Sequence, residues 1–451
     1  MTANTKTNGQ ASQRLALMFR ALGHRNYRLY ASGQLISLVG TWMQFVAQSW
    51  LVYRLTDSAT LLGLVGFASQ IPVFLLAPIG GAFADNHNRH RILIIVQSIA
   101  MLLAATLALL TLTGVVQVWH VFVLASLLGI VNAFDIPTRQ SFLVELVGKQ
   151  DLFNAISLNS SMVNLARLLG PALAGVIVAT TGEGLVFLIN SLTYIAVIGC
   201  LLLMHWQTVV RPNGSISTLA GIFQGFQYAW QTRPVRGLLI LLALVSLTGM
   251  PYTVLMPIFA DRVLGGGPGA LGLLLGASGC GALIGALSLA ARSGIYGLGR
   301  WVAWASGGFG LGLVLFSFSS HFGLSMAIMA VTGFAMMIEM SASNTLIQTM
   351  VPDNLRGRVM AVYSMMFMGM APFGALLAGT LADHVGAPLT VRLGGGICVV
   401  GALLFALALP ALRREGRQII VALQMTGGGP ANEMTGGKGV LTHAEGGTRS
   451  S

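Results

Sequence analysis

The chain has 451 residues, of which 55% are hydrophobic and 8% are charged, and its formal net charge is +12. A soluble domain carries about a quarter charged residues, so this composition excludes a water-facing surface over most of the chain. Apolar runs of about 20 residues recur, and each is long enough to cross a bilayer as a helix. Because the runs do not alternate apolar with polar residues, they also exclude the strands of a membrane barrel. We therefore predict an all-α integral membrane protein.

Twelve transmembrane helices are predicted in two bundles of six. In chain order they cover about residues 29–52, 59–83, 92–112, 119–137, 155–178, 185–205, 237–259, 270–291, 301–319, 323–346, 359–383 and 389–410. An even number of spans places both termini on one side of the membrane. Of the 25 Lys and Arg residues, only Arg54, Arg262 and Arg392 fall on the opposite side, and Arg167 lies within the fifth span. The positive-inside rule then predicts that both termini are cytoplasmic.

The distribution of charge and cysteine excludes other kinds of site. A nucleic-acid surface would gather its basic residues in one domain with interleaved aromatic residues, which is not the pattern here. The three cysteines, Cys200, Cys280 and Cys398, stand alone inside apolar spans. We therefore predict no disulfide framework and no metal site, and we expect no cofactor.

A polar connection divides the chain into two halves of similar length. The predicted organisation is an N-terminal segment (1–28), a six-helix bundle (29–205), a linker (206–236), a second six-helix bundle (237–412) and a flexible tail (413–451). Within the linker, "LAGIFQGFQYAW" has an apolar face at helical spacing and could lie on the inner membrane surface. Similar segments occur at matching positions of the two halves: "GPALAG" (170–175) lies in the fifth span and "APFGALLAG" (371–379) in the eleventh.

The first helix carries a polar stripe. Spacings of three and four residues place its members on one face of the helix: Gln34, Ser37, Thr41, Gln44 and Gln48. Lipid would not accept such a stripe, so it faces either a central cavity or a neighbouring helix. For Gln44 and Gln48 we favour the cavity. Tyr252, next to Pro251 in a broken seventh helix, and Asn132 in the fourth helix are further cavity candidates.

The link between the second and third spans, "GGAFADNHNRHR" (80–91), is unusually charged for this chain. Its Gly81, Asp85 and Arg89 lie four residues apart and resemble motif A of the major facilitator superfamily. The sequence departs from that motif at Phe83 and at Asn86 and Asn88. The resemblance implies a conformational latch in which Asp85 and Arg89 act against the start of the eleventh helix, with Arg139 as a partner. A second match, "GTLADHVG" (379–386), lacks the Arg and is interpreted as coincidental.

Three longer segments indicate which branch of this superfamily the chain resembles. "NAFDIPTRQSFLVELVGKQDLFNAISLNSS", "LLGPALAG" and "VPDNLRGRVMAVYSM" are similar to the bacterial exporter branch that includes the enterobactin exporter and macrolide efflux proteins. The resemblance implies a location in the inner membrane of a bacterium, and alternating access around a cavity lined by the first, fourth, seventh and tenth helices. Proton antiport is common among its drug exporters. Gly170, Pro171 and Gly175 resemble the antiporter signature of the fifth helix, but Met162 and Ala166 stand where that signature has glycines.

A charged residue within a membrane span costs free energy, so each one is by default a candidate functional residue. Glu339, well inside the tenth helix, is our candidate for the group that exchanges protons, since desolvation favours its neutral form. Arg167 would either tune Glu339, bind an anionic substrate or form a static pair with an acid. Asp135, close to the inner end of the fourth helix, is included in the proton-coupling group, although such a position is more typical of a helix-end residue.

The sequence favours a secondary active exporter of a siderophore or drug-like compound, coupled to protons and functional as a monomer. The alternative is an uncoupled facilitator or importer, for example of lipid-like solutes. No P-loop, HExxH or GxSxG motif is present, which argues against an enzyme and against ATP-driven pumping by this chain alone. The expected partners are a small-molecule substrate, protons and membrane lipid.

Overall fold

The fold is all-helical over the described part of the chain. The computed structural model describes residues 20–205, 218–292 and 294–425. Twelve helical segments in these ranges are long and apolar enough to cross a membrane. The predicted fold class and the predicted number of spans are confirmed.

The N-terminal half contains the first six spans. Its elements are η1 (Arg20–Gly23), α2 (Arg25–Thr56), α3 (Ala59–Asn86), α4 (Arg89–Leu112), α5 (Val118–Thr181) and α6 (Glu183–Leu202). The long α5 comprises two spans, Val118–Gly148 and Gln150–Thr181. Between them the chain turns at Gly148, whose φ of 70° lies in the left-handed region that only glycine adopts without strain.

The C-terminal half repeats the six spans with more interruptions. Its spans are formed by α8 (Arg233–Leu244), η2 (Val245–Gly249), α9 (Tyr252–Ile258), η3 (Phe259–Val263), α10 (Gly267–Ala290), α11 (Leu298–Phe318), α12 (Phe322–Met350), α13 (Asp353–Met368), α14 (Met370–Val385) and α15 (Ala387–Met425). The seventh span runs from α8 to η3 and is broken, as predicted. Pro251 and Pro257 remove backbone donors, and π-helical turns form at η2 and η3.

The linker contains a helix, α7 (Thr218–Gln231), at the segment where the sequence shows helical spacing, and its Tyr228 hydroxyl donates to the Met350 carbonyl at 2.8 Å. One predicted boundary needs correction. The tail was expected to be flexible from residue 413, but α15 continues as a helix to Met425. Packing stabilises this extension, because Gly416 lies against Met350 and Glu415 pairs with Arg233 at 3.3 Å. Residues 1–19 of the predicted N-terminal segment, 206–217 of the linker and 426–451 of the tail lie outside the described residues.

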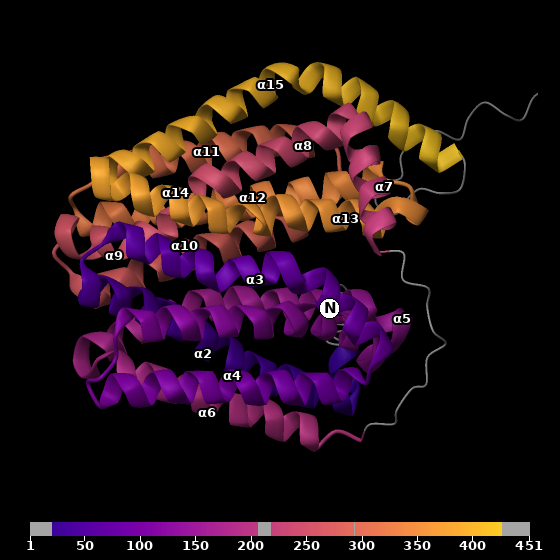
Figure 1. The fold of residues 1–451 in the computed structure, drawn as a ribbon. Helices are drawn as coiled ribbons and strands as arrows, with labels where there is room; N and C mark the ends of the chain where they lie inside the picture. The colour runs from indigo at the N-terminus through magenta and orange to yellow at the C-terminus, as the bar shows by residue number, and fades with distance from the viewer. Residues whose placement is uncertain (1–19, 206–217, 293, 426–451) are drawn as a thin grey trace, which may run out of the picture.

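The two halves lie one above the other in Figure 1, with the helices of both running lengthwise. We call the end that carries η1, α7 and the last turns of α15 the basic end, and the other the short-loop end. One apolar cluster near the short-loop end combines buried residues of both halves, including Leu51, Leu62, Leu255 and Leu271. The two clusters nearer the basic end each belong to a single half. The halves therefore share a core only toward the short-loop end.

Candidate transport site and gates

Two helix pairs join the halves through backbone contacts. In the first, α3 packs on α14, where a Cβ added at Gly63 would lie 2.5 Å from the Ala375 carbonyl. In the second, α5 packs on α10, where a Cβ added at Gly175 would lie 2.9 Å from the Gly272 Cα. Such approach is possible only for residues without side chains, and small residues allow it in lipid. Both contacts lie in the parts of the helices nearer the short-loop end.

The predicted packing residues of the fifth span meet different partners. Gly170 faces α2, since a Cβ there would lie 2.5 Å from the Trp42 Cβ. Gly175 and the Pro171 carbonyl face Gly272 of the other half. The "GPALAG" segment thus lies at both an intra-half and an inter-half contact.

Hydrogen bonds between the two halves close the short-loop end. The Asp383 carboxylate of α14 accepts hydrogen bonds from the backbone amides of Ala59 at 2.8 Å and Thr60 at 2.9 Å, at the N-terminus of α3. The Ser58 hydroxyl also donates to it at 2.9 Å. The carboxylate therefore caps a helix of the opposite half, where it satisfies free amides and the positive end of the helix dipole. The segment "GTLADHVG", interpreted from sequence as coincidental, supplies this cap.

Two further links cross between the halves at the same end. The Tyr53 hydroxyl donates to Asp261 at 2.8 Å, and Arg262 pairs with Asp57. Among the described residues, the hydrogen bonds and ion pairs that join the two halves all lie at this end. The short-loop end is therefore closed.

The predicted latch residues Asp85 and Arg89 do form an ion pair, at 2.5 Å. Arg89 also pairs with Glu145 of α5 at 2.7 Å, a residue that the sequence analysis did not single out. Gly81 has no tight contact; the close approach of α3 to α5 occurs at the preceding Gly80, beside the Ala133 carbonyl. The close approach of the two helices therefore depends on Gly80 and not on Gly81, the glycine of the motif.

Arg139 lies in a different network from the latch. It pairs with Asp135 one turn earlier on α5, and the Gln97 amide donates to the same carboxylate at 2.8 Å. This is the static, hydrogen-bonded arrangement in which a buried charge is best tolerated. The expected partnership of Arg139 with the latch is not present in this conformation, because the nearer carboxylate of Asp135 holds its guanidinium.

Glu339 is completely buried in the interior of the C-terminal half. Neither carboxylate oxygen has a hydrogen-bond partner in the described structure, and the hydroxyls of Ser306 and Ser343 are also unpartnered. The antiparallel packing of α11 on α12 brings Gly308 against Ala335, which places Ser306 and Glu339 at the same level. Polar atoms thus gather here without a cation beside them, and no ion pair joins Glu339 to Arg167 in the parts of the chain that are described.

Arg167 lies on the fifth span where the halves meet. Its guanidinium is 5.0 Å from the centroid of the Trp42 ring, a cation–π contact. Tyr252 of the opposite half lies near it. The Tyr252 hydroxyl in turn lies 3.1 Å from the Ser278 hydroxyl. Within the described residues no carboxylate pairs with Arg167, so the static-pair interpretation is not supported.

The polar stripe of α2 points largely into the N-terminal half. Gln44 was expected in the cavity, but it is buried and accepts a hydrogen bond from Asn190 of α6 at 2.5 Å. In this structure Gln44 therefore faces α6, since periodicity identifies a polar face without identifying the helix that covers it. Gln48 and Asn132 are half-buried. Among the described residues, no group of His, Cys, Asp or Glu could hold a metal ion.

Comparison with known proteins identifies relatives along most of the chain. Residues 18–425 match the family model described as transmembrane secretion effector. The staphyloferrin A transporter of Staphylococcus aureus is 29% identical over 82% of this chain and 94% of its own length. The multidrug efflux pump Tap of Mycolicibacterium fortuitum is 30% identical over 77% of this chain and 87% of its own. The enterobactin exporter EntS of Shigella boydii is 23% identical over 87% of this chain and 93% of its own length.

Solved structures share the fold at much lower identity. The nucleoside transporter NupG has a TM-score of 0.66 at 13% identity, over 85% of this chain and 99% of that one. The POT family transporter PepTSo has a TM-score of 0.67 at 11% identity, over 87% of this chain and 99% of that one. Family model, relatives and fold agree: the chain belongs to the transmembrane secretion effector family, in the bacterial exporter branch of the major facilitator superfamily.

Proposed function

We propose that this protein exports a small organic molecule, a siderophore or a drug-like compound, by alternating access coupled to proton entry. The cargo class follows the names of the relatives, which include a staphyloferrin A transporter and a multidrug efflux pump. In this proposal the basic end and both termini face the cytoplasm, as the positive-inside rule predicts. A single chain holds both halves and suffices for transport.

The observation that carries the proposal is the environment of Glu339. An ionised carboxylate buried without partners at membrane depth costs several kcal/mol. We therefore expect Glu339 to hold a proton in this conformation and to release it when the C-terminal half rearranges and water or a cation reaches it. A carboxyl group that alternates in this way couples proton movement to the conformational cycle.

Arg167 supports an acidic cargo. It places a cation between the halves with no carboxylate partner among the described residues, and Trp42 and Tyr252 lie beside it. An acidic group on the substrate could supply the missing partner through charge-assisted hydrogen bonds. Because the side-chain links between the halves lie at the short-loop end, we expect the cargo to enter from the basic end, on the cytoplasmic side. In the opposite conformation, the Asp85–Arg89 latch would meet the start of α13.

The test is efflux from cells loaded with a catecholate siderophore or with a hydrophobic dye, with and without a protonophore. We expect wild type to expel at least one compound, and both Glu339→Gln and the protonophore to stop that efflux. The control Glu415→Gln makes the same substitution at a carboxylate at the basic end of the same half. It should leave efflux unchanged.

Three results would contradict parts of the proposal. Efflux that survives both Glu339→Gln and the protonophore would make the protein an uncoupled facilitator. Accumulation in place of efflux would make it an importer. If wild type moves neither compound, the cargo class is wrong.

A further inference from the structure

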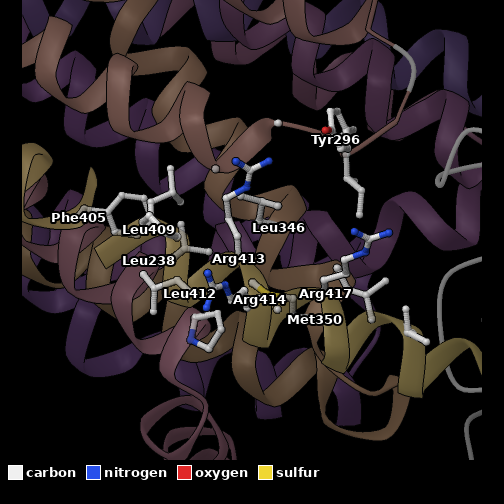
Figure 2. A pocket seen from close by; sticks show the side chains of 18 residues that line it. Leu238, Tyr296, Leu346, Met350, Phe405, Leu409, Leu412, Arg413, Arg414 and Arg417 are labelled. Carbon is white, nitrogen blue, oxygen red and sulfur yellow. The ribbon is translucent and has the colours of Figure 1, made fainter. Parts of the chain in front are cut away.

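A pocket of about 560 Å³ lies at the basic end of the C-terminal half, away from the contact between the halves (Figure 2). The ends of α8 and α12, the loop before α11 and the helical extension of α15 surround it. Its floor is apolar and includes the buried side chains of Leu238, Met350, Phe405 and Leu409. Its volume falls within the range of roughly 300–1,000 Å³ that is typical of small-ligand sites.

Three arginines of α15 line the same pocket. Figure 2 shows Arg413, Arg414 and Arg417 along the wall that this helix forms, with Tyr296 from the loop before α11 on another wall. In the described parts of the chain, no carboxylate lies within ion-pair distance of any of the three. The neighbouring Glu415 is already paired, with Arg233 at 3.3 Å. The pocket therefore combines an apolar floor with uncompensated positive charge.

The backbone adds to that charge. Gly297 and Gly299, at the start of the 21-residue helix α11, belong to the pocket wall. The amides in the first turn of a helix and its dipole favour an anion at this position. The site is thus positive on two sides, from guanidinium groups and from a helix N-terminus.

The helix α15 also presents apolar side chains to the membrane on the turns that precede the pocket. Above it on α15, Leu403, Leu404 and Leu407 are exposed apolar side chains within the predicted twelfth span, and they would contact lipid. A ligand with an acyl chain along α15 and an anionic head against the arginines would satisfy both parts of the site. A small soluble anion would leave the apolar floor uncovered.

We propose that this pocket binds the headgroup and upper acyl chain of an acidic glycerophospholipid from the leaflet at the basic end. Basic pockets between transmembrane helices at a cytoplasmic surface favour such headgroups. The bound lipid would connect the extension of α15 to α8 and to the loop before α11, and it would stabilise the folded C-terminal half by mass action. The proposal does not depend on the identity of the transported substrate.

Native mass spectrometry of the full chain in detergent tests the proposal. Phosphatidylglycerol or phosphatidylethanolamine would be titrated into wild type and into the double variant Arg413→Gln/Arg417→Gln. We expect wild type to prefer phosphatidylglycerol and the double variant to bind it at least about tenfold more weakly. The matched control Arg28→Gln/Arg91→Gln removes the same charge from exposed positions at the basic end of the N-terminal half and should bind as wild type does.

A second variant separates shape from charge. Val421→Trp keeps all three arginines but places a large ring at the pocket wall, and it should also weaken phosphatidylglycerol binding. Gel filtration and thermal unfolding confirm that each variant is folded. Equal phosphatidylglycerol binding by wild type and the double variant would overturn the proposal. Displacement of the lipid by glycerol phosphate at similar concentration would also overturn it, because the pocket would then be a site for soluble anions.

Discussion

The Asp383 carboxylate accepts a hydrogen bond from the backbone amide of Ala59, at 2.8 Å, although the two residues belong to opposite halves of the molecule. Asp383 lies at the end of α14, and Ala59 is the first residue of α3. A helix N-terminus leaves its first amides without intrahelical partners, so a carboxylate from another helix can cap it. The contact forms only while the short-loop end is closed, which makes it a reporter of conformation.

Asp383→Ala should therefore favour opening of the short-loop end. Loss of an N-cap costs about 1 kcal/mol, which corresponds to roughly a fivefold change in the ratio of closed to open molecules. Electron paramagnetic resonance can measure this ratio from spin labels at the exposed positions Thr113 and Ser320, in a background without the native cysteines. Glu415→Ala, at the basic end, is the control and should not widen the distance distribution. An unchanged distribution in Asp383→Ala would show that the cap does not hold the closed state.

Gly272→Ala should disturb the same end through packing. A Cβ at this position would overlap the Pro171 carbonyl of the other half, so the helices must separate, at a cost of about 1–3 kcal/mol. Gly276→Ala on the same helix is the control, because its Cβ would lie 3.4 Å from the nearest atom, an ordinary contact. Labelling of a cysteine at Ser320 by a membrane-impermeant thiol reagent would compare the two. Equal labelling rates would count against close inter-half packing.

Arg89→Gln should destabilise the protein more than Asp85→Asn. The Arg89 and Glu145 side chains are only 10% and 14% exposed, whereas Asp85 is 67% exposed. Removing the arginine takes a cation from a buried carboxylate and should cost about 2–3 kcal/mol, whereas the exposed carboxylate contributes less than about 1 kcal/mol. Thermal unfolding in detergent gives the comparison. A larger loss for Asp85→Asn would contradict the burial-based argument.

Gln44→Ala should lower stability without changing which substrates are transported. Its partner Asn190 would be left as a buried amide without that hydrogen bond, at a cost of about 1–3 kcal/mol. Replacing both residues by leucine should recover part of the loss, since no polar group then remains unpaired. Unfolding temperatures and a substrate panel check the prediction. A change in substrate range with unaltered stability would instead place Gln44 in the cavity.

Arg167→Gln should weaken binding of an anionic siderophore about tenfold or more while leaving a neutral dye unaffected, because one charge-assisted hydrogen bond is lost. Arg167→Lys keeps the charge but loses the planar guanidinium that stacks on Trp42. Its affinity for the anionic siderophore should lie between those of wild type and Arg167→Gln. Binding titrations of purified protein measure both ligands. Equal weakening for the neutral and the anionic ligand would assign Arg167 a structural role.

Much of the fold could be predicted from the sequence because its signals are local. The length of each apolar run determines whether it can span the bilayer, so all twelve spans were found, including the break near Pro251. The pairing of Asp85 with Arg89 is also local, since residues four apart lie on one helix face. A helical tail was missed because its stability comes from packing of Gly416 on Met350 and not from periodicity.

The sequence by itself determined which helices exist and which side chains are costly in a membrane. Only the tertiary structure decided what those side chains face. Gln44 turns toward Asn190, Arg139 toward Asp135, and Glu339 toward an interior without a partner. Asp383 reaches α3, more than 300 positions earlier in the chain. Hydropathy describes the transfer of a single residue from water to lipid and can be read from the sequence. The partner of a polar side chain, in contrast, depends on which helices pack side by side.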